Sequence, residues 1–157
     1  MVLPIYAYGH EVLKKVGVEI DQDYPELKEF IESMWETMYH AKGVGLAAHQ
    51  VGHPIRIFIV DTVQVEKEGT EGKGIKKIFI NAEILEESGE EWAYEEGCLS
   101  IPDIHADVMR QPKILIKYQD EQFAVHTETY DGMNARVIQH EYDHIEGKLF
   151  VEKINPL

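Results

Sequence analysis

Two histidines near the end of the chain, His140 and His144, lie four positions apart, and Glu141 directly follows the first. On an α-helix, four residues make just over one turn, so both imidazoles project from the same face and can bind one ion. The carboxylate of Glu141 would lie close to that ion without having to bind it, and could transfer protons there. This arrangement is typical of a metal-dependent hydrolase. A motif this short also arises by chance, so it needs support from the rest of the chain.

A third metal ligand is required, because catalytic zinc-type sites use three protein ligands and leave one position for water. The candidates are Cys98, Asp143 and the remaining histidines. Asp143 points about 100° away from His144 around the helix, which favours a supporting role. Cys98 is the best remaining donor, after a sharp bend expected at Gly97, but a lone cysteine is often a small buried hydrophobic residue. The residue types alone leave both interpretations of Cys98 open. A Cys-His-His set would suit Zn²⁺, Fe²⁺, Ni²⁺ or Co²⁺.

Composition and charge narrow the class of protein. The length of 157 residues fits a single domain, and the hydrophobic fraction of 44% is ordinary for a globular chain. A formal charge of −14 would repel phosphates, so nucleic-acid binding is not expected. With one cysteine, no intrachain disulfide can form. We expect neither a membrane span nor a signal peptide, because no segment is long and apolar enough, and we therefore expect cytoplasmic localisation.

Two helices are predicted. Apolar side chains recur at helical spacing at Leu27, Phe30, Ile31, Met34, Trp35 and Met38. Asp23 or Tyr24 would lie near the cap of this first helix, with Pro25 in its first turn. Gly43 would end it in the left-handed conformation. The second helix would run over residues 131–147 and carry the histidine motif.

Strands are predicted between these helices. Residues 55–60 and 77–81 are apolar and β-branched, as in buried strands. The polar residues 82–91 would form a third strand or an irregular edge. Residues 113–118 alternate in polarity and would pair with residues 123–130 as a hairpin. Without regular β-α-β alternation, this order predicts an α+β fold with antiparallel or mixed sheets packed around the C-terminal helix.

Three separate stretches together resemble the signature motifs of the peptide deformylase family, in the order in which that family has them. They are residues 43–50 (GVGLAAHQ), residues 96–100 (EGCLS) and residues 139–144 (QHEYDH). The resemblance extends to residues 9–10 and 147–150, so it spans nearly the whole chain. Three motifs in order are far more specific than any one of them.

The resemblance implies an enzyme that removes the formyl group from the N-terminal formyl-methionine of new polypeptides and releases formate. It assigns one divalent metal ion to Cys98, His140 and His144, which resolves the choice for Cys98 in favour of a ligand. The family's metal is typically Fe²⁺, with Zn²⁺, Ni²⁺ or Co²⁺ able to substitute. The family fold is α+β, in agreement with the predicted elements.

Three further residues are expected to carry out the chemistry. In the mechanism that the resemblance implies, a metal-bound hydroxide attacks the formyl carbon. Glu141 would take the water proton and deliver it to the departing amine. The Gln50 side-chain amide and the Leu99 backbone N–H would donate hydrogen bonds to the developing oxyanion.

Substrate contacts are expected on both sides of the ion. Val137 and Tyr94 are candidates for an apolar pocket around the methionine side chain. Substrate main chain would pair as an added strand. The residues expected to bind it are Val44, Gly45, Glu96 and Gly97.

The expected partners are nascent formyl-methionyl polypeptides, with possible contact at the ribosome, and the chain is expected to be a monomer. His49 and His105 depart from the residues common in the family, which are proline or threonine at the first position and arginine at the second. We do not expect His49 to be a metal ligand. The alternative functions are a zincin-like endopeptidase and an inert peptide-binding or metal-binding relative, both disfavoured by the joint presence of Glu141, Gln50 and the three ligands.

Overall fold

A computed structural model describes residues 1–153, and one antiparallel sheet of five strands is its largest element. The strand order is β1-β2-β3-β6-β7. Their bounds are Gly45–Ala47 (β1), Ile57–Asp61 (β2), Lys76–Ser88 (β3), Lys113–Gln119 (β6) and Val125–Asp131 (β7). A second sheet contains β4 (Trp92–Cys98) and β5 (Ile101–Arg110), also antiparallel. The two α-helices are α1 (Leu27–His40) and α2 (Gly132–Ile145), and 3-10 turns cover Glu11–Lys14 (η1), Ala48–Val51 (η2), Val63–Val65 (η3) and Phe150–Lys153 (η4).

The two helices cover opposite faces of the large sheet. Successive side chains of a strand point to opposite faces, so β2 contributes to two separate cores. Phe58 and Val60 pack in the core that contains the buried side of α2. Ile57 and Ile59 pack in the other core, with α1. Burial on both faces explains why β2 is apolar without alternation.

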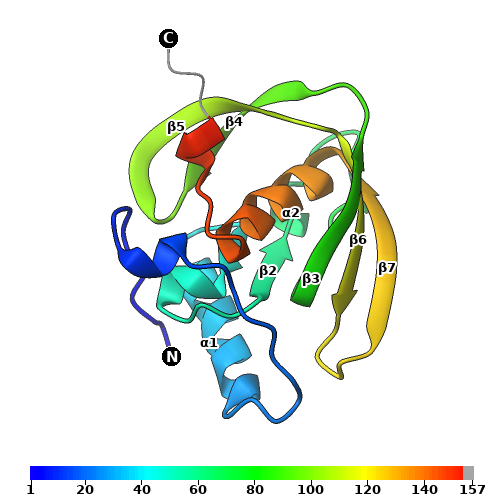
Figure 1. Cartoon of the computed structure of the whole chain (residues 1–157). Helices are drawn as coiled ribbons and strands as arrows, with labels where there is room; N and C mark the ends of the chain where they lie inside the picture. The colour runs from blue at the N-terminus through cyan, green and yellow to red at the C-terminus, as the bar shows by residue number, and fades with distance from the viewer. Residues whose placement is uncertain (154–157) are drawn as a thin grey trace.

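Helix α2 lies at the centre of the molecule, with the β4–β5 hairpin arching across one side of it and the large sheet on the other (Figure 1). The predicted α+β fold with a central C-terminal helix is therefore confirmed. Within residues 1–153, no helix combines the length and the apolar character needed to cross a bilayer. The expected single domain includes residues 154–157, which lie outside the described residues.

The predicted ends of the first helix are wrong. Helix α1 begins at Leu27, after Glu26 in the left-handed region at φ 56°, and Pro25 precedes it. At the other end, Lys42 and not Gly43 takes a positive φ, of 62°. Gly43 lies against Leu99, and a Cβ on this glycine would lie 2.7 Å from the Leu99 side chain.

Two strand predictions also need correction. Residues 82–88 do not form a separate strand but continue β3, whose register with β6 shifts after Ile80 and again after Ile84. Gly97 does not form a sharp bend, since it lies inside β4 and pairs with His105. The chain reverses at Leu99 and Ser100 instead. A Cβ on Gly97 would lie 2.6 Å from the His105 ring, so this glycine permits a close cross-strand contact. The 113–118 hairpin and the second helix are confirmed.

Candidate metal centre

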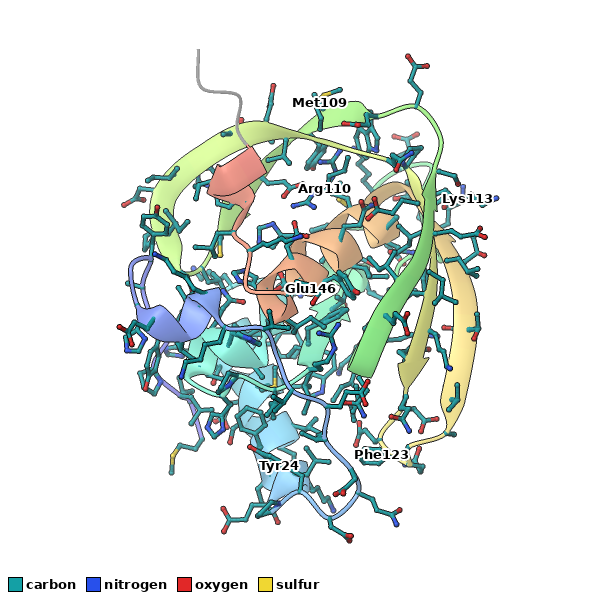
Figure 2. All side chains as sticks on the ribbon, viewed as in Figure 1. Tyr24, Met109, Arg110, Lys113, Phe123 and Glu146 are labelled. Atoms are coloured by element: carbon teal, nitrogen blue, oxygen red, sulfur yellow. The ribbon has the colours of Figure 1, made fainter. Side chains whose placement is uncertain are left out.

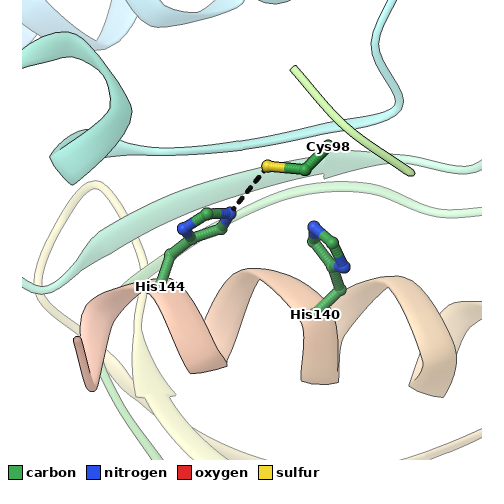
Figure 3. Close-up of side chains that lie close together, drawn as sticks. All are labelled: Cys98, His140 and His144. Carbon is green, nitrogen blue, oxygen red and sulfur yellow. Dashed lines mark hydrogen bonds between the residues drawn. The ribbon is translucent and has the colours of Figure 1, made fainter. Parts of the chain in front are cut away.

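The proposed ligands come together from two elements. Helix α2 presents His140 and His144 one turn apart, and their ring centroids are 5.4 Å from each other. Cys98, the last residue of β4, places its Sγ 3.3 Å from His144 Nε2. One ligand atom from each residue lies within 4.8 Å of the others (Figure 3). The histidine spacing predicted the helical pair, and the structure adds the thiol from the β4–β5 hairpin.

This donor set fits a divalent transition metal. Tetrahedral zinc with ordinary bond lengths would place sulfur and nitrogen about 3.6 Å apart, close to the observed Cys98–His144 separation. His140 Nδ1 lies 2.9 Å from Glu96 Oε1, so its Nε2 remains available for the ion. A carboxylate behind a ligating histidine is the usual way in which proteins fix the ring and its tautomer. The residues present therefore fit the metal that the motif predicts.

The ionisation of the ligands depends strongly on burial and neighbours. Burial alone lowers the pKa of His140, but hydrogen bonds to Cys98 and Glu96 raise it to about 10 in the metal-free protein. Burial lowers the pKa of His144 well below its usual value, and the charge on His140 lowers it further. Because a metal binds only the neutral imidazole, His140 would have to release a proton to bind an ion.

The Glu96 side chain is the centre of a buried ion-pair network. Arg110 donates to both of its carboxylate oxygens, at 2.7 and 3.0 Å, and Arg136 donates to Oε2 at 2.7 Å. Arg110 also donates to Asp143 at 2.9 Å, and Figure 2 shows it reaching from β5 toward α2. Burial raises the pKa of Glu96, but hydrogen bonds from His140 and Arg110 outweigh this and lower it to about 2. Glu96 is therefore a stable anion that holds the His140 ring.

Sequence reasoning missed Arg110 and Arg136, and assigned Glu96 only a backbone role toward substrate. Two periodicities could have indicated the arginines. Arg136 lies four positions before His140 on the same face of α2. Arg110 lies two positions after the buried Val108 and therefore shares its face of β5.

Glu141 lies beside the ligands and close to strand β1. A Cβ on Gly45 would lie 2.5 Å from Glu141 Oε2, so only glycine allows the carboxylate to approach this strand. Burial raises the pKa of Glu141 to about 7 in the metal-free protein, and its Oε1 has no partner among the described residues. A carboxyl group that titrates near neutral pH is suited to accepting and returning a proton.

The Gln50 amide is held in a fixed orientation. Its Oε1 accepts a hydrogen bond from the Ala47 backbone N–H at 3.0 Å. Its Nε2 therefore points the other way, toward Ser100 Oγ at 3.2 Å and Cys98 Sγ at 3.5 Å. Leu99, the other predicted oxyanion donor, directly follows Cys98. Both donors thus lie on the thiol side of the site.

A cavity of about 530 Å³ opens onto this site. Every predicted site residue except the buried His144 lines this cavity. These lining residues are Val44, Gly45, Gln50, Tyr94, Glu96, Gly97, Cys98, Leu99, Val137, His140 and Glu141. Val137 is buried, as a pocket floor requires, whereas Tyr94 is 40% exposed. His105, Met133 and Arg136 also line the cavity and were not predicted to do so.

Comparison with known proteins agrees with this geometry. A family model described as Polypeptide deformylase matches residues 2–157. A peptide deformylase from Christiangramia forsetii is 57% identical over 164 residues, covering 100% of this chain and 84% of the relative. The crystal structure of peptide deformylase from Thermotoga maritima has a TM-score of 0.87 at 40% identity, covering 99% of both chains. A Met-Ala-Ser bound class I type b peptide deformylase from Acinetobacter baumannii has a TM-score of 0.87 at 34% identity, covering 98% of this chain and 99% of that one. This chain therefore belongs to the peptide deformylase family of enzymes.

Proposed function

We propose that this enzyme hydrolyses the N-formyl group of formyl-methionyl peptides in a site that holds one divalent metal ion on Cys98, His140 and His144. The observation that carries this proposal is the cluster of the three ligands, two of which line one cavity together with Glu141 and Gln50. A protease-like helix alone would need neither the thiol nor the oriented amide.

A bound divalent ion would lower the pKa of a water molecule and polarise the formyl carbonyl. The buried Glu141 carboxylate takes the proton of the attacking water and returns it to the methionine nitrogen as the formamide bond breaks. The Gln50 amide and the Leu99 backbone N–H donate to the oxygen that becomes negative. The Ala47 N–H, which donates to Gln50 Oε1, keeps the Nε2 donor directed toward the thiol side of the site.

The cavity accounts for recognition of the substrate. The relative from Acinetobacter baumannii binds Met-Ala-Ser, and we propose that this chain accepts the formylated form of such a peptide. Val137 would contact the methionine side chain deep in the cavity and Tyr94 would contact it nearer the mouth. Glycines at positions 45 and 97 would leave the backbone open for pairing with the peptide, together with Val44 and Glu96.

Further properties belong to the same proposal. We expect Fe²⁺ to be the metal in the cell, and residues 1–157 to act as a single catalytic domain. The natural substrates would be nascent chains, met in the cytoplasm and near the ribosome by a monomeric enzyme. The formal charge of −14 supports the expectation that nucleic acid is not bound directly.

Formyl-Met-Ala-Ser provides the direct test of this function. Protein purified without oxygen and loaded with Fe²⁺ is expected to release one formate for each Met-Ala-Ser formed, as measured by a formate assay together with chromatography. The same peptide carrying an N-terminal acetyl group tests the fit of the small formyl group and should react far more slowly. Absence of formate release from the loaded protein, or cleavage at an internal peptide bond, would contradict the proposal.

Replacing Cys98 tests the metal site separately from turnover. We expect Cys98→Ser to weaken Zn²⁺ binding by more than about 100-fold, the upper end for residues that only support a ligand. The reason is that a neutral hydroxyl is a poor substitute for a thiolate. Cys98→Asp supplies an anionic oxygen ligand and should retain more metal than Cys98→Ser. Metal content after gel filtration and competition with a chelator measure both effects, and unchanged affinity in Cys98→Ser would remove the thiol from the site.

A further inference from the structure

The two metal-binding histidines differ in what lies behind them. His140 Nδ1 is 2.9 Å from the Glu96 carboxylate, whereas His144 Nδ1 is buried and has no hydrogen-bond partner among the described residues. A ligating histidine almost always uses its second nitrogen to donate to an acceptor. The ring of His144 faces Cys98 with Nε2, and its other nitrogen points away from the thiol (Figure 3). This second nitrogen carries the proton of the neutral ring, so it needs an acceptor.

His49 has a buried acceptor nitrogen without a donor, whereas His144 has a buried donor nitrogen without an acceptor. Its side chain is fully buried, and its Nε2 lies 2.7 Å from the Lys15 backbone oxygen. A carbonyl oxygen can only accept, so Nε2 must carry the proton and Nδ1 must be a bare acceptor. Nδ1 is buried and has no partner among residues 1–153. Burial also lowers the pKa of His49, which keeps this tautomer neutral.

The chain packing brings together the segments that carry the two rings. His49 belongs to η2, which packs against α2. Gly17 links the two elements, because its N–H donates to the Ile145 oxygen at 2.6 Å and a Cβ on it would lie 2.9 Å from His49 Cε1. The acceptor of one ring and the donor of the other therefore belong to a shared buried region.

We propose that His49 is a positioning residue for the metal ligand His144, whose Nδ1–H it holds through one bridging water. The two nitrogens are not in direct hydrogen-bond contact, and a buried water commonly joins such a donor and acceptor. His49 would thereby fix the tautomer of His144 that leaves Nε2 free, as Glu96 does for His140. The inference rests on the proposed metal site and adds a connection from the backbone of Lys15 to the ion.

Two substitutions of His49 separate this role from simple anchoring of the N-terminal segment. The amide of His49→Asn places an acceptor near the position of Nδ1 but cannot reach the Lys15 oxygen. The longer His49→Gln can donate to Lys15 but has no acceptor near Nδ1. If His49 positions His144, His49→Gln should weaken Zn²⁺ binding by roughly 10- to 100-fold, as for other residues behind a ligand, while His49→Asn remains near the parent. His49→Asn should instead show the lower Tm in the metal-free protein.

Chelator competition with Zn²⁺ and thermal unfolding measure these effects without any turnover assay. The reverse order of affinities, or equal affinities in the two variants, would overturn the positioning role. Failure of the unmodified protein to bind Zn²⁺ would instead overturn the proposed metal site, so the two failures are distinguishable.

Nitrogen NMR of the unmodified, Zn²⁺-loaded protein provides a test that does not depend on any variant folding. We expect His49 to be protonated on Nε2 alone, and His144 to carry a proton on Nδ1 that exchanges slowly with solvent. A proton on Nδ1 of His49 would leave no acceptor for His144 and would overturn the inference.

Discussion

Replacing Glu141 by glutamine is expected to lower kcat for formyl-Met-Ala-Ser by about 10²- to 10⁴-fold, the range typical of a lost general acid–base group. The amide has nearly the shape of the carboxylate but cannot accept a proton from water or return one to the leaving nitrogen. Glu141 is buried, lines the cavity and has an unpartnered Oε1, so its carboxylate is free to exchange a proton with a molecule bound there. Glu141→Ala is expected to abolish nearly all turnover as well.

Metal binding should survive this change, because Glu141 is not one of the three clustered ligand residues. The Tm should not fall, since burial raises the pKa of the carboxyl to about 7 and so disfavours its charged form. Glu29→Gln makes the same chemical change at an exposed position of α1 and should behave as the parent. A Glu141→Gln enzyme that retains more than a tenth of the parent kcat at full metal content would exclude Glu141 as the proton carrier.

Removal of the Glu96 carboxylate is expected to have the largest effect on stability. Glu96→Ala takes from Arg136, at 2% exposure, the carboxylate that it pairs with, and leaves Arg110, at 5% exposure, with Asp143 alone. Breaking a buried ion pair in this way costs about 3–5 kcal/mol. The pKa of Glu96, lowered to about 2, indicates that the carboxylate is charged throughout the neutral range and that the full loss applies there.

Urea unfolding in the presence of a chelator measures this loss without any contribution from the metal. The variant should also bind Zn²⁺ about 10- to 100-fold more weakly, because the His140 ring loses its acceptor. Glu91→Ala removes an exposed carboxylate just before the same strand and should leave both quantities unchanged. If the free energy of unfolding fell by less than about 1 kcal/mol, the ion pairs of Glu96 would be no stronger than surface pairs, which would contradict the buried network.

The elements whose residues are close in sequence were predictable. Helix α2 and the β6–β7 hairpin follow from periodicity and turn residues, and both agree with the structure. The ends of α1 were not predictable in the same way. Lys42 takes the left-handed position expected of Gly43. The preference for glycine at this position does not identify which of two adjacent residues adopts the left-handed conformation.

The supporting residues of the site were the least predictable. A glutamate or an arginine within a strand or helix is by default an exposed residue, and a histidine is only sometimes buried. Glu96, Arg110 and Arg136 are buried only because the β4–β5 hairpin folds over α2 and pairs their charges. His49 is buried only because η2 lies between the N-terminal segment and the end of α2.

By itself, the sequence determined the His140–Glu141–His144 face, because four residues of helix place both rings on one side whatever surrounds them. Its three ordered motifs also determined the family to which the chain belongs. Only the tertiary structure decided which carboxylate holds His140, which glycine admits Glu141 and which buried atoms remain unpaired. These depend on distances between segments 40 to 100 residues apart, and such distances are set by how the hairpin and the sheet pack around α2, not by local spacing.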